Sequence, residues 1–220
     1  MRRDPASVRA GRIGPGLLAT SLPSVKPATL LLVPRLVLVK HSLPEISPER
    51  PRSEWRLSDE GRVRAVRLGE RLRTYDVDRI VTSPEPKAFE TATVVAQTLG
   101  SITVETLDAL REHDDRDAPF QDETSFRATV RRFFAHSNEA VFGPETADDA
   151  QRRFASGVEA LLRSREGAAT VVVAHGRVIS LFVARRNAED PYVLWGRLGL
   201  PSFVVLELPS YVLVEVIEGV

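Results

Sequence analysis

The stretch ATVVVAHG at residues 169–176 decides the fold that we expect for this chain. Its first six residues form an uninterrupted apolar run rich in β-branched side chains, which is typical of a strand buried on both faces. His175 and Gly176 follow directly, and a helix is expected to begin at Gly176. This order of strand, His-Gly and helix predicts that His175 lies at the carboxyl end of a central strand.

Strands and helices alternate on both sides of this stretch. Short strands are expected at 35–40 (RLVLVK), 78–82 (DRIVT) and 102–105, and a closing hairpin at 203–208 and 211–217. One helix is expected after a cap at Ser58, and a second begins at Pro84 with Ser83 as its cap. Two more helices are expected at 123–136 and 146–165. The alternation predicts an α/β fold, a three-layer αβα sandwich around a mostly parallel sheet with an antiparallel edge hairpin.

Three of the expected strands end in residues suited to bind an anion. Lys40, His41 and Ser42 end the first strand, Ser83 follows the second and leads to Lys87, and His175 with Gly176 follows the central strand. Ligands of open α/β sheets bind beyond the carboxyl ends of the strands, where helix N-termini favour anions. Two histidines and two lysines at that edge therefore predict a phosphate site.

The chain is expected to consist of a flexible N-terminal extension at 1–33 and one folded domain at 34–220. The extension holds five basic residues against one acid, Asp4, among scattered glycine, proline and serine. A targeting segment is also basic and acid-poor, so that alternative stays open. Proline and glycine interrupt any amphipathic helix there, which favours the flexible extension.

Composition excludes several classes of protein. Thirty basic residues balance thirty acidic ones, so no basic excess points to nucleic acid. The best apolar run, 29–39, is broken by Pro34 and Arg35 and is too short to cross a membrane. The chain has no cysteine, which excludes disulfides and thiolate metal sites and fits a cytoplasmic location. Nothing in the sequence indicates an oligomeric state.

The motifs, in this order, resemble the histidine phosphatase superfamily, the phosphoglycerate-mutase-like group, over about residues 35–217. VKHS (39–42) stands where the family has Arg-His-Gly, and TSPEPKAFETA (82–92) stands where it has Ser-Ser-Pro-x-x-Arg-Ala-x-x-Thr-Ala. Leu110-Arg111-Glu112 matches the family's Leu-x-Glu acid, and VVVAHG (171–176) matches its closing His-Gly. LSDEGRVRAVRLGERL (57–72) and GPETADDAQRR (143–153) are similar to two weaker family segments.

The resemblance implies a phosphomonoesterase that acts on a small phosphorylated metabolite through a phosphohistidine intermediate. His41 would be the nucleophile, Glu112 would protonate the leaving oxygen, and His175 would complete the catalytic set. Lys40, Lys87, Ser42 and Gly176 would bind the phosphoryl group. Such a site needs no metal and no other cofactor, because fixed cations stabilise the phosphoryl oxygens.

Two departures from the family pattern affect the expected chemistry. Lys40 and Lys87 stand where the family has arginine, so a compact ammonium replaces a planar guanidinium that can bind two oxygens at once. Only three of the thirty basic residues are lysine. Two lysines at these two positions are therefore interpreted as selected rather than as the result of drift. The family's Glu-Thr pair is also missing, because Leu43-Pro44-Glu45 follows Ser42. The substrates of better-known members therefore do not carry over.

Two other functions remain open. A phosphate-binding module without turnover is compatible with the lysines, although binding alone needs no general acid. A mutase would return the phosphoryl group to another oxygen, but the group's mutases carry longer insertions than this core can hold. Residues 108–122 are expected to form an acidic, irregular loop, and its residues His113, Asp114, Asp115 and Asp117 are interpreted as solvated rather than metal-binding. Arg50, Arg52, Trp55 and Arg56 could touch a substrate, although surface placement is the simpler expectation.

Overall fold

A computed structural model describes residues 33–116, 118–163 and 167–220 of the chain. Within them, a six-stranded sheet has the order β3-β2-β4-β1-β5-β6. Its strands are β1 (Arg35–Lys40), β2 (Val77–Thr82), β3 (Val104–Thr106), β4 (Ala169–Ala174), β5 (Ser202–Glu207) and β6 (Val212–Ile217). The extension predicted at 1–33 lies outside the described residues except for Val33.

The sheet is mixed. The pairs β1–β4, β2–β4 and β2–β3 are parallel. Along β1 and β4, the register runs from Arg35 opposite Ala169 to Lys40 opposite Ala174. β5 pairs antiparallel with both β1 and β6, which closes the sheet with a hairpin. The predicted α/β fold with a mostly parallel sheet and an antiparallel edge hairpin is confirmed.

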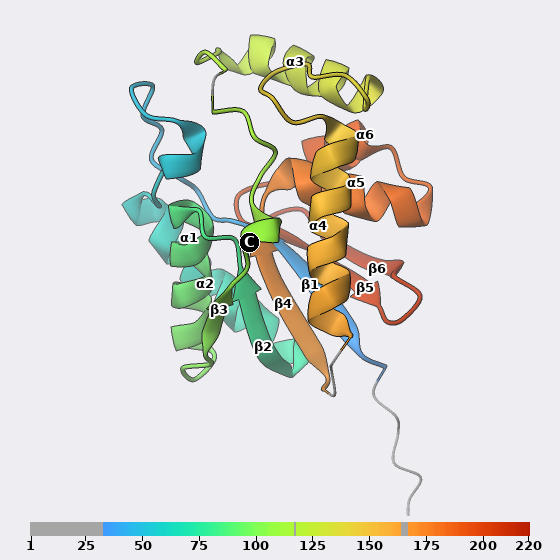
Figure 1. Cartoon of the computed structure of the whole chain (residues 1–220). Helices are drawn as coiled ribbons and strands as arrows, with labels where there is room; N and C mark the ends of the chain where they lie inside the picture. The colour runs from blue at the N-terminus through green and yellow to red at the C-terminus, as the bar shows by residue number, and fades with distance from the viewer. Residues whose placement is uncertain (1–32, 117, 164–166) are drawn as a thin grey trace, which may run out of the picture. The chain divides into compact units, whose positions relative to one another are not determined.

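The sheet separates two layers of helices (Figure 1). Alternate residues of each strand point to opposite faces. Val37 and Val39 of β1 pack with α1 (Asp59–Leu72) and α2 (Pro86–Thr98), whereas Leu36 and Leu38 pack on the opposite side. The helices that cover that second side are α3 (Glu123–Ala135), α4 (Ala147–Leu162), α5 (Gly176–Asn187) and α6 (Pro191–Arg197). Three short 3-10 turns, η1 (Arg52–Glu54), η2 (Arg73–Tyr75) and η3 (Asp108–Leu110), complete the described elements.

Helix α1 is tied to the loop that follows β1. Ser58 caps the helix by accepting a hydrogen bond from the N–H of Gly61, as predicted, and its hydroxyl donates to the carbonyl of Leu43. A Cβ atom at position 61 would lie 2.0 Å from the carbonyl oxygen of Leu43. Only glycine therefore allows α1 to approach the loop that carries His41 and Ser42.

The predicted start of α2 is wrong by two residues. The helix begins at Pro86, with Glu85 rather than Ser83 at the cap position. Proline disfavours helical backbone in the residue before it, and Glu85 accordingly has extended dihedral angles, φ −62° and ψ 134°. Pro86 therefore takes the first helical position that was expected for Pro84. The hydroxyl of Ser83 instead accepts a hydrogen bond from the N–H of Glu85.

Other elements lie close to their predicted ranges. Strand β3 begins two residues later than expected, and α4 ends at Leu162 rather than 165. Helix α6 and the 3-10 turns were not expected. The described helices include none with the length and apolar character that a bilayer crossing requires.

Candidate active site

Three strand ends meet at one edge of the sheet. His41, Ser83 and His175 follow β1, β2 and β4, which are neighbours in the order β2-β4-β1. The N–H of His41 donates to the carbonyl of Ala174 at 3.0 Å, and the N–H of Ser83 donates to that of Val173 at 2.9 Å. Backbone hydrogen bonds thus hold together the three segments in which the sequence indicated anion-binding chemistry.

The imidazole rings of His41 and His175 are in direct contact. Their centroids lie 5.2 Å apart, edge to face, and both side chains are buried. Nδ1 of His41 lies 2.8 Å from the carbonyl oxygen of Ser42. Because a carbonyl only accepts, this contact assigns the proton to Nδ1 and leaves a lone pair on Nε2. The assigned tautomer is the one in which Nε2 can act as a nucleophile.

The surroundings keep both rings neutral. Burial lowers the pKa of His41 well below its ordinary value, and the positive charge of Lys87 lowers it further. Burial and Lys87 also lower the pKa of His175. Nε2 of His175 lies 2.9 Å from the hydroxyl of Ser83, while its buried Nδ1 has no partner among the described residues. A neutral His41 is therefore available near pH 7 without help from a general base.

Ser42 holds the His41 segment in place. Its N–H donates to the hydroxyl of Thr91 at 2.9 Å, and its hydroxyl donates to the carbonyl of Gly61 at 2.7 Å. Its carbonyl oxygen is the partner of His41 Nδ1. Both donors of this residue, which the sequence suggested for phosphate binding, already have partners within the protein.

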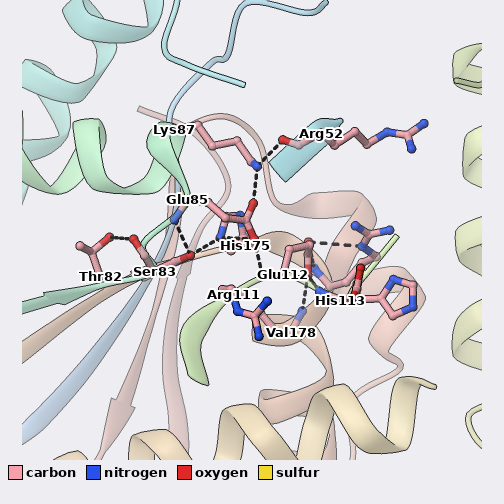
Figure 2. A network of polar contacts seen from close by, with 12 residues as sticks. Arg52, Thr82, Ser83, Glu85, Lys87, Arg111, Glu112, His113, His175 and Val178 are labelled. Carbon is pink, nitrogen blue, oxygen red and sulfur yellow. Dashed lines mark hydrogen bonds and ion pairs between the residues drawn. The ribbon is translucent and has the colours of Figure 1, made fainter. Parts of the chain in front are cut away.

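Lys87 lies in a buried ion pair. Its ammonium donates to the carboxylate of Glu85 at 2.6 Å and to the carbonyl of Arg52 at 2.7 Å (Figure 2). The other oxygen of Glu85 accepts from the N–H of Glu112 at 2.8 Å and lies 3.4 Å from Nε2 of His175. Glu85 thus connects a cation, a histidine and the segment of the expected general acid.

Lys40 occupies a confined position at the end of β1. Its ammonium donates to the carbonyl of Leu198 at 2.6 Å. Burial lowers the pKa of Lys40 to about 8, with Glu112 opposing this change and two arginines adding to it. A Cβ atom at Gly176 would lie 3.2 Å from Cε of Lys40 and 3.0 Å from the ring of Trp195. Glycine at 176 therefore gives Lys40 the space it occupies.

The carboxylate of Glu112 sits at the N-terminus of α5. It accepts hydrogen bonds from the backbone N–H groups of His113 and Val178 at 3.0 and 3.2 Å (Figure 2). The backbone N–H of Arg177 donates to it at 3.1 Å, and the guanidinium of Arg177 lies 3.3 Å away. Burial alone would raise the pKa of Glu112, but the positive charge of Arg177 and the backbone donors outweigh it and hold the pKa below its ordinary value. Glu112 is therefore ionised in the free protein.

Arg153 and Glu145 organise the loop that carries Glu112. Arg153 of α4 donates to the carbonyls of Ala109, Arg111 and Glu112, and it pairs with Glu145 at 2.8 Å. Glu145 in turn accepts from the N–H of Asp114 at 3.0 Å. These contacts tie the segment around Glu145 and Arg153 of α4 to the loop that carries the expected acid.

The interpretation of the acidic loop as simply solvated is wrong for two of its residues. His113 is 1% exposed and packs between Phe133 and Phe142, and Asp115 is 7% exposed. Their burial is compensated by partners, since Nε2 of His113 lies 2.7 Å from the carbonyl of Glu145 and the carboxylate of Asp115 pairs with arginine. Asp117 lies outside the described residues. The described residues include no group of three or more acidic, histidine or cysteine side chains that could hold a metal ion.

Two arginines form a second charged layer at the site: Arg177 was not predicted, whereas Arg52 was named as a possible substrate contact. Arg177, the residue after His-Gly, is 3% exposed and pairs with Asp115 at 2.9 Å. Arg52 lies 3.6 Å from the same carboxylate and covers the ring of Phe126 at 4.8 Å. The available signal for Arg177 was an arginine next to the apolar run that fills the middle of α5. The sequence could not predict that Arg52 lies near Asp115, because that approach depends on tertiary structure.

These residues line one cleft of about 1040 Å³. The loop after β1 and helix α3 extend beyond the carboxyl ends of the parallel strands, above the sheet in Figure 1. The cleft contains six of the seven predicted site residues, namely Lys40, His41, Lys87, Glu112, His175 and Gly176, together with Glu85, Arg52, Asp115 and Arg177. Its outer walls add the rings of Trp55, Phe126 and Trp195. The lining thus combines lysines and arginines with a similar number of carboxylates, several of them in ion pairs, and adds partly apolar walls of the kind found in small-molecule sites.

Comparison with known families shows which class of protein has this fold. Residues 36–208 match the model of the histidine phosphatase superfamily, branch 1. The chain belongs to this superfamily, whose members are phosphatases or mutases. A curated relative, phosphoglycerate mutase-like protein 4 of Arabidopsis thaliana, is 29% identical over 154 residues, covering 66% of this chain and 67% of the relative.

Solved structures share the fold. A mycobacterial glucosyl-3-phosphoglycerate phosphatase in complex with VO3 is 24% identical, with a TM-score of 0.68 over 85% of this chain and 100% of that one. A phosphoserine phosphatase from Entamoeba histolytica in complex with 3-phosphoglyceric acid is 16% identical, with a TM-score of 0.65 over 83% of this chain and 96% of that one. At these identities the likeness establishes the fold.

Proposed function

We propose that this protein is a phosphomonoesterase that carries the phosphoryl group on Nε2 of His41 before passing it to water. The observation that supports the proposal most strongly is the hydrogen bond between Nδ1 of His41 and the carbonyl of Ser42, at 2.8 Å. That contact leaves the lone pair of Nε2 free in a cleft that also contains His175, Lys40 and Lys87. A neutral nucleophile beside fixed cations is what phosphoryl transfer requires.

In the first step, Nε2 of His41 attacks phosphorus and the bond from phosphorus to the ester oxygen breaks. Lys40, Lys87 and His175 stabilise the nonbridging oxygens as their charge shifts. The departing oxygen takes a proton from Glu112 and leaves as an alcohol. The phosphoryl group stays on His41 as a phosphohistidine.

Glu112 must gain a proton before this step, because it is ionised in the free protein. A phosphate ester bound beside it brings negative charge, and a nearby like charge raises the pKa of a carboxyl group. A substrate that binds as its monoanion can supply the proton directly. In the second step Glu112 takes a proton from water, the oxygen of that water attacks phosphorus, and inorganic phosphate leaves as the bond to His41 breaks.

Lys40 and Lys87 are proposed to take the place of the two arginines in the family pattern. An ammonium keeps the charge and gives up the two-pronged contact of a guanidinium. Both ammonium groups already donate to backbone carbonyls, of Leu198 and Arg52 respectively, which fixes their positions. The substrate is proposed to be a small phosphorylated metabolite, in keeping with the size of the cleft and the phosphorylated molecules named for the structural relatives.

A phosphate-binding module without turnover is the main rival, and one observation favours it. The Glu112 carboxylate already has three backbone N–H partners and a guanidinium, so it is a poorer proton donor than a free carboxyl group. The mutase alternative differs in its acceptor, since it would return the phosphoryl group to a substrate oxygen rather than to water.

A screen of phosphorylated metabolites and one aryl phosphate tests the proposal. The native protein should release inorganic phosphate from at least one of them, and His41→Ala should release none. His136→Ala is the matched control, because the His136 side chain is 50% exposed and lies outside the cleft lining. Tight substrate binding with no released phosphate would favour the binding module, and an isomeric phosphate ester as the product would favour the mutase.

A further inference from the structure

Glu85 carries a buried carboxylate whose partners are all groups of the candidate site. One oxygen lies 2.6 Å from the ammonium of Lys87. The other accepts from the N–H of Glu112 at 2.8 Å and lies 3.4 Å from Nε2 of His175. Figure 2 shows the carboxylate between Lys87 and His175. The side chain is 8% exposed and belongs to the lining of the cleft.

The same groups are those that the proposed function assigns to the phosphoryl oxygens. Lys87 and His175 are two of the three side chains expected to contact a bound phosphate. The ammonium of Lys87 has three N–H donors, of which Glu85 takes one and the carbonyl of Arg52 takes another. A carboxylate and a phosphate are both oxyanions, so they compete for the same donors.

We propose that Glu85 is a resident anion that occupies half of the phosphate site in the free protein, and that a phosphoryl group binds by displacing its carboxylate from Lys87 and His175. This inference rests on the proposed function, because it takes Lys87 and His175 as phosphate ligands. The carboxylate keeps the buried ammonium paired while the site is empty, which avoids an isolated buried charge. It also returns when phosphate leaves, so it lowers the affinity for the product.

The position of Glu85 in the chain permits this exchange. The residue precedes α2 in extended conformation, and its side chain makes no capping hydrogen bond to the helix. Its movement therefore leaves the helix intact. When the Glu85 carboxylate moves away, the backbone N–H of Glu112 loses this acceptor and can donate to a phosphoryl oxygen instead. Two anions at one site repel each other strongly, so a phosphate that binds without displacing Glu85 would bind weakly.

The first test is a crystal structure of the native protein with inorganic phosphate. We expect an oxygen of the anion within hydrogen-bonding distance of the ammonium of Lys87 and of Nε2 of His175, with the Glu85 side chain turned away from both. Phosphate bound in the cleft while Glu85 remains on Lys87 would overturn the proposal. This test uses the native chain, so it does not depend on the folding of a variant.

The second test measures the dissociation constant of inorganic phosphate by calorimetry for Glu85→Gln. Glutamine keeps the shape and one acceptor but removes the charge, so phosphate should bind about tenfold more tightly or better, as expected when a like charge is removed. Glu123→Gln is the matched control, because Glu123 also lines the cleft but its side chain is 79% exposed, where solvent screens its charge. Unchanged or weaker binding to Glu85→Gln would contradict the proposal.

The outcomes also separate this inference from the proposed function. Displacement of Glu85 by phosphate in a protein that hydrolyses no ester would support the resident anion and contradict the phosphatase. Hydrolysis by a protein in which Glu85 stays on Lys87 would do the reverse. If neither the native protein nor Glu85→Gln binds phosphate, the resident-anion proposal fails, while the proposed function is decided by the metabolite screen.

Discussion

The rings of His41 and His175 lie edge to face with their centroids 5.2 Å apart, both buried at the carboxyl edge of the sheet. Burial and the charge of Lys87 lower the pKa of each ring. The site therefore pairs two neutral imidazoles with two ammonium groups that carry the positive charge. Among these groups, Lys40 has its pKa lowered to about 8 by burial, so its charge is the quantity that pH changes above neutrality.

Lys40 should set the alkaline limit of activity. Its pKa of about 8 in the free protein means that the ammonium loses its proton, and its hold on the phosphoryl group, above that pH. We expect kcat/KM to fall about tenfold per pH unit above pH ~8, since kcat/KM reports groups of the free enzyme. Lys40→Arg should abolish this limb, because arginine stays charged.

Lys87→Arg serves as the matched control for Lys40→Arg and should keep the alkaline limb. The profiles should be measured with a substrate whose phosphate group is fully ionised throughout the range. An alkaline limb that is unchanged in Lys40→Arg would assign it to another group and remove Lys40 from the phosphate site.

Glu112→Gln should affect substrates according to their leaving groups. An alkyl oxygen must be protonated as it leaves, whereas an aryl oxygen needs little help. The substitution should therefore lower kcat for an alkyl phosphate by about 10²–10⁴-fold, the usual contribution of a general acid, and lower kcat for an aryl phosphate much less. Equal losses on both substrates would indicate that Glu112 only holds the N-terminus of α5.

The buried histidines should make the fold sensitive to acid. Burial lowers the pKa of His113 to about 4, from 6.5 for an unperturbed histidine. Between these values the unfolded chain binds a proton that the folded protein does not, so the free energy of unfolding decreases as pH falls. Each such histidine contributes up to about 1.4 kcal/mol per pH unit to this slope.

His113→Phe tests this contribution, because a phenyl ring suits the space between Phe133 and Phe142 and does not titrate. Urea unfolding at pH 6.5 and 5 should give a smaller loss of stability in this variant than in the native protein. The same slope in His113→Phe and the native protein would mean that His113 binds its proton in the folded state.

Local sequence patterns predicted most of the fold because they reflect local physics. The apolar run at 169–174 and the Ser58 cap each specify their element without reference to distant residues. The predicted start of α2 was wrong because two prolines follow Ser83 closely. The second one, Pro86, restricts the backbone of Glu85 to extended conformations, so the helix begins after Glu85. Helix α6 is only seven residues long, too short for a periodic pattern to stand out.

The candidate site was predictable where it follows strand ends and not where it depends on tertiary contacts. His41 and His175 stand directly after apolar strands, so parallel pairing alone brings them together. Burial of Asp115 depends on Arg177, which is distant in sequence, and nothing local distinguishes Asp115 from its solvated neighbours. Glu85 was missed for a similar reason, since its role depends on contacts with Lys87, His175 and Glu112 together.

The most direct test of the account is to trap the phosphorylated protein during turnover and locate the phosphate. Native protein mixed with substrate and quenched in alkali should carry one phosphoryl group on His41, identified by peptide mass spectrometry. The label should disappear on acid treatment, and His41→Ala should neither carry it nor release phosphate. Phosphate on another residue, or full turnover by His41→Ala, would contradict the proposed mechanism.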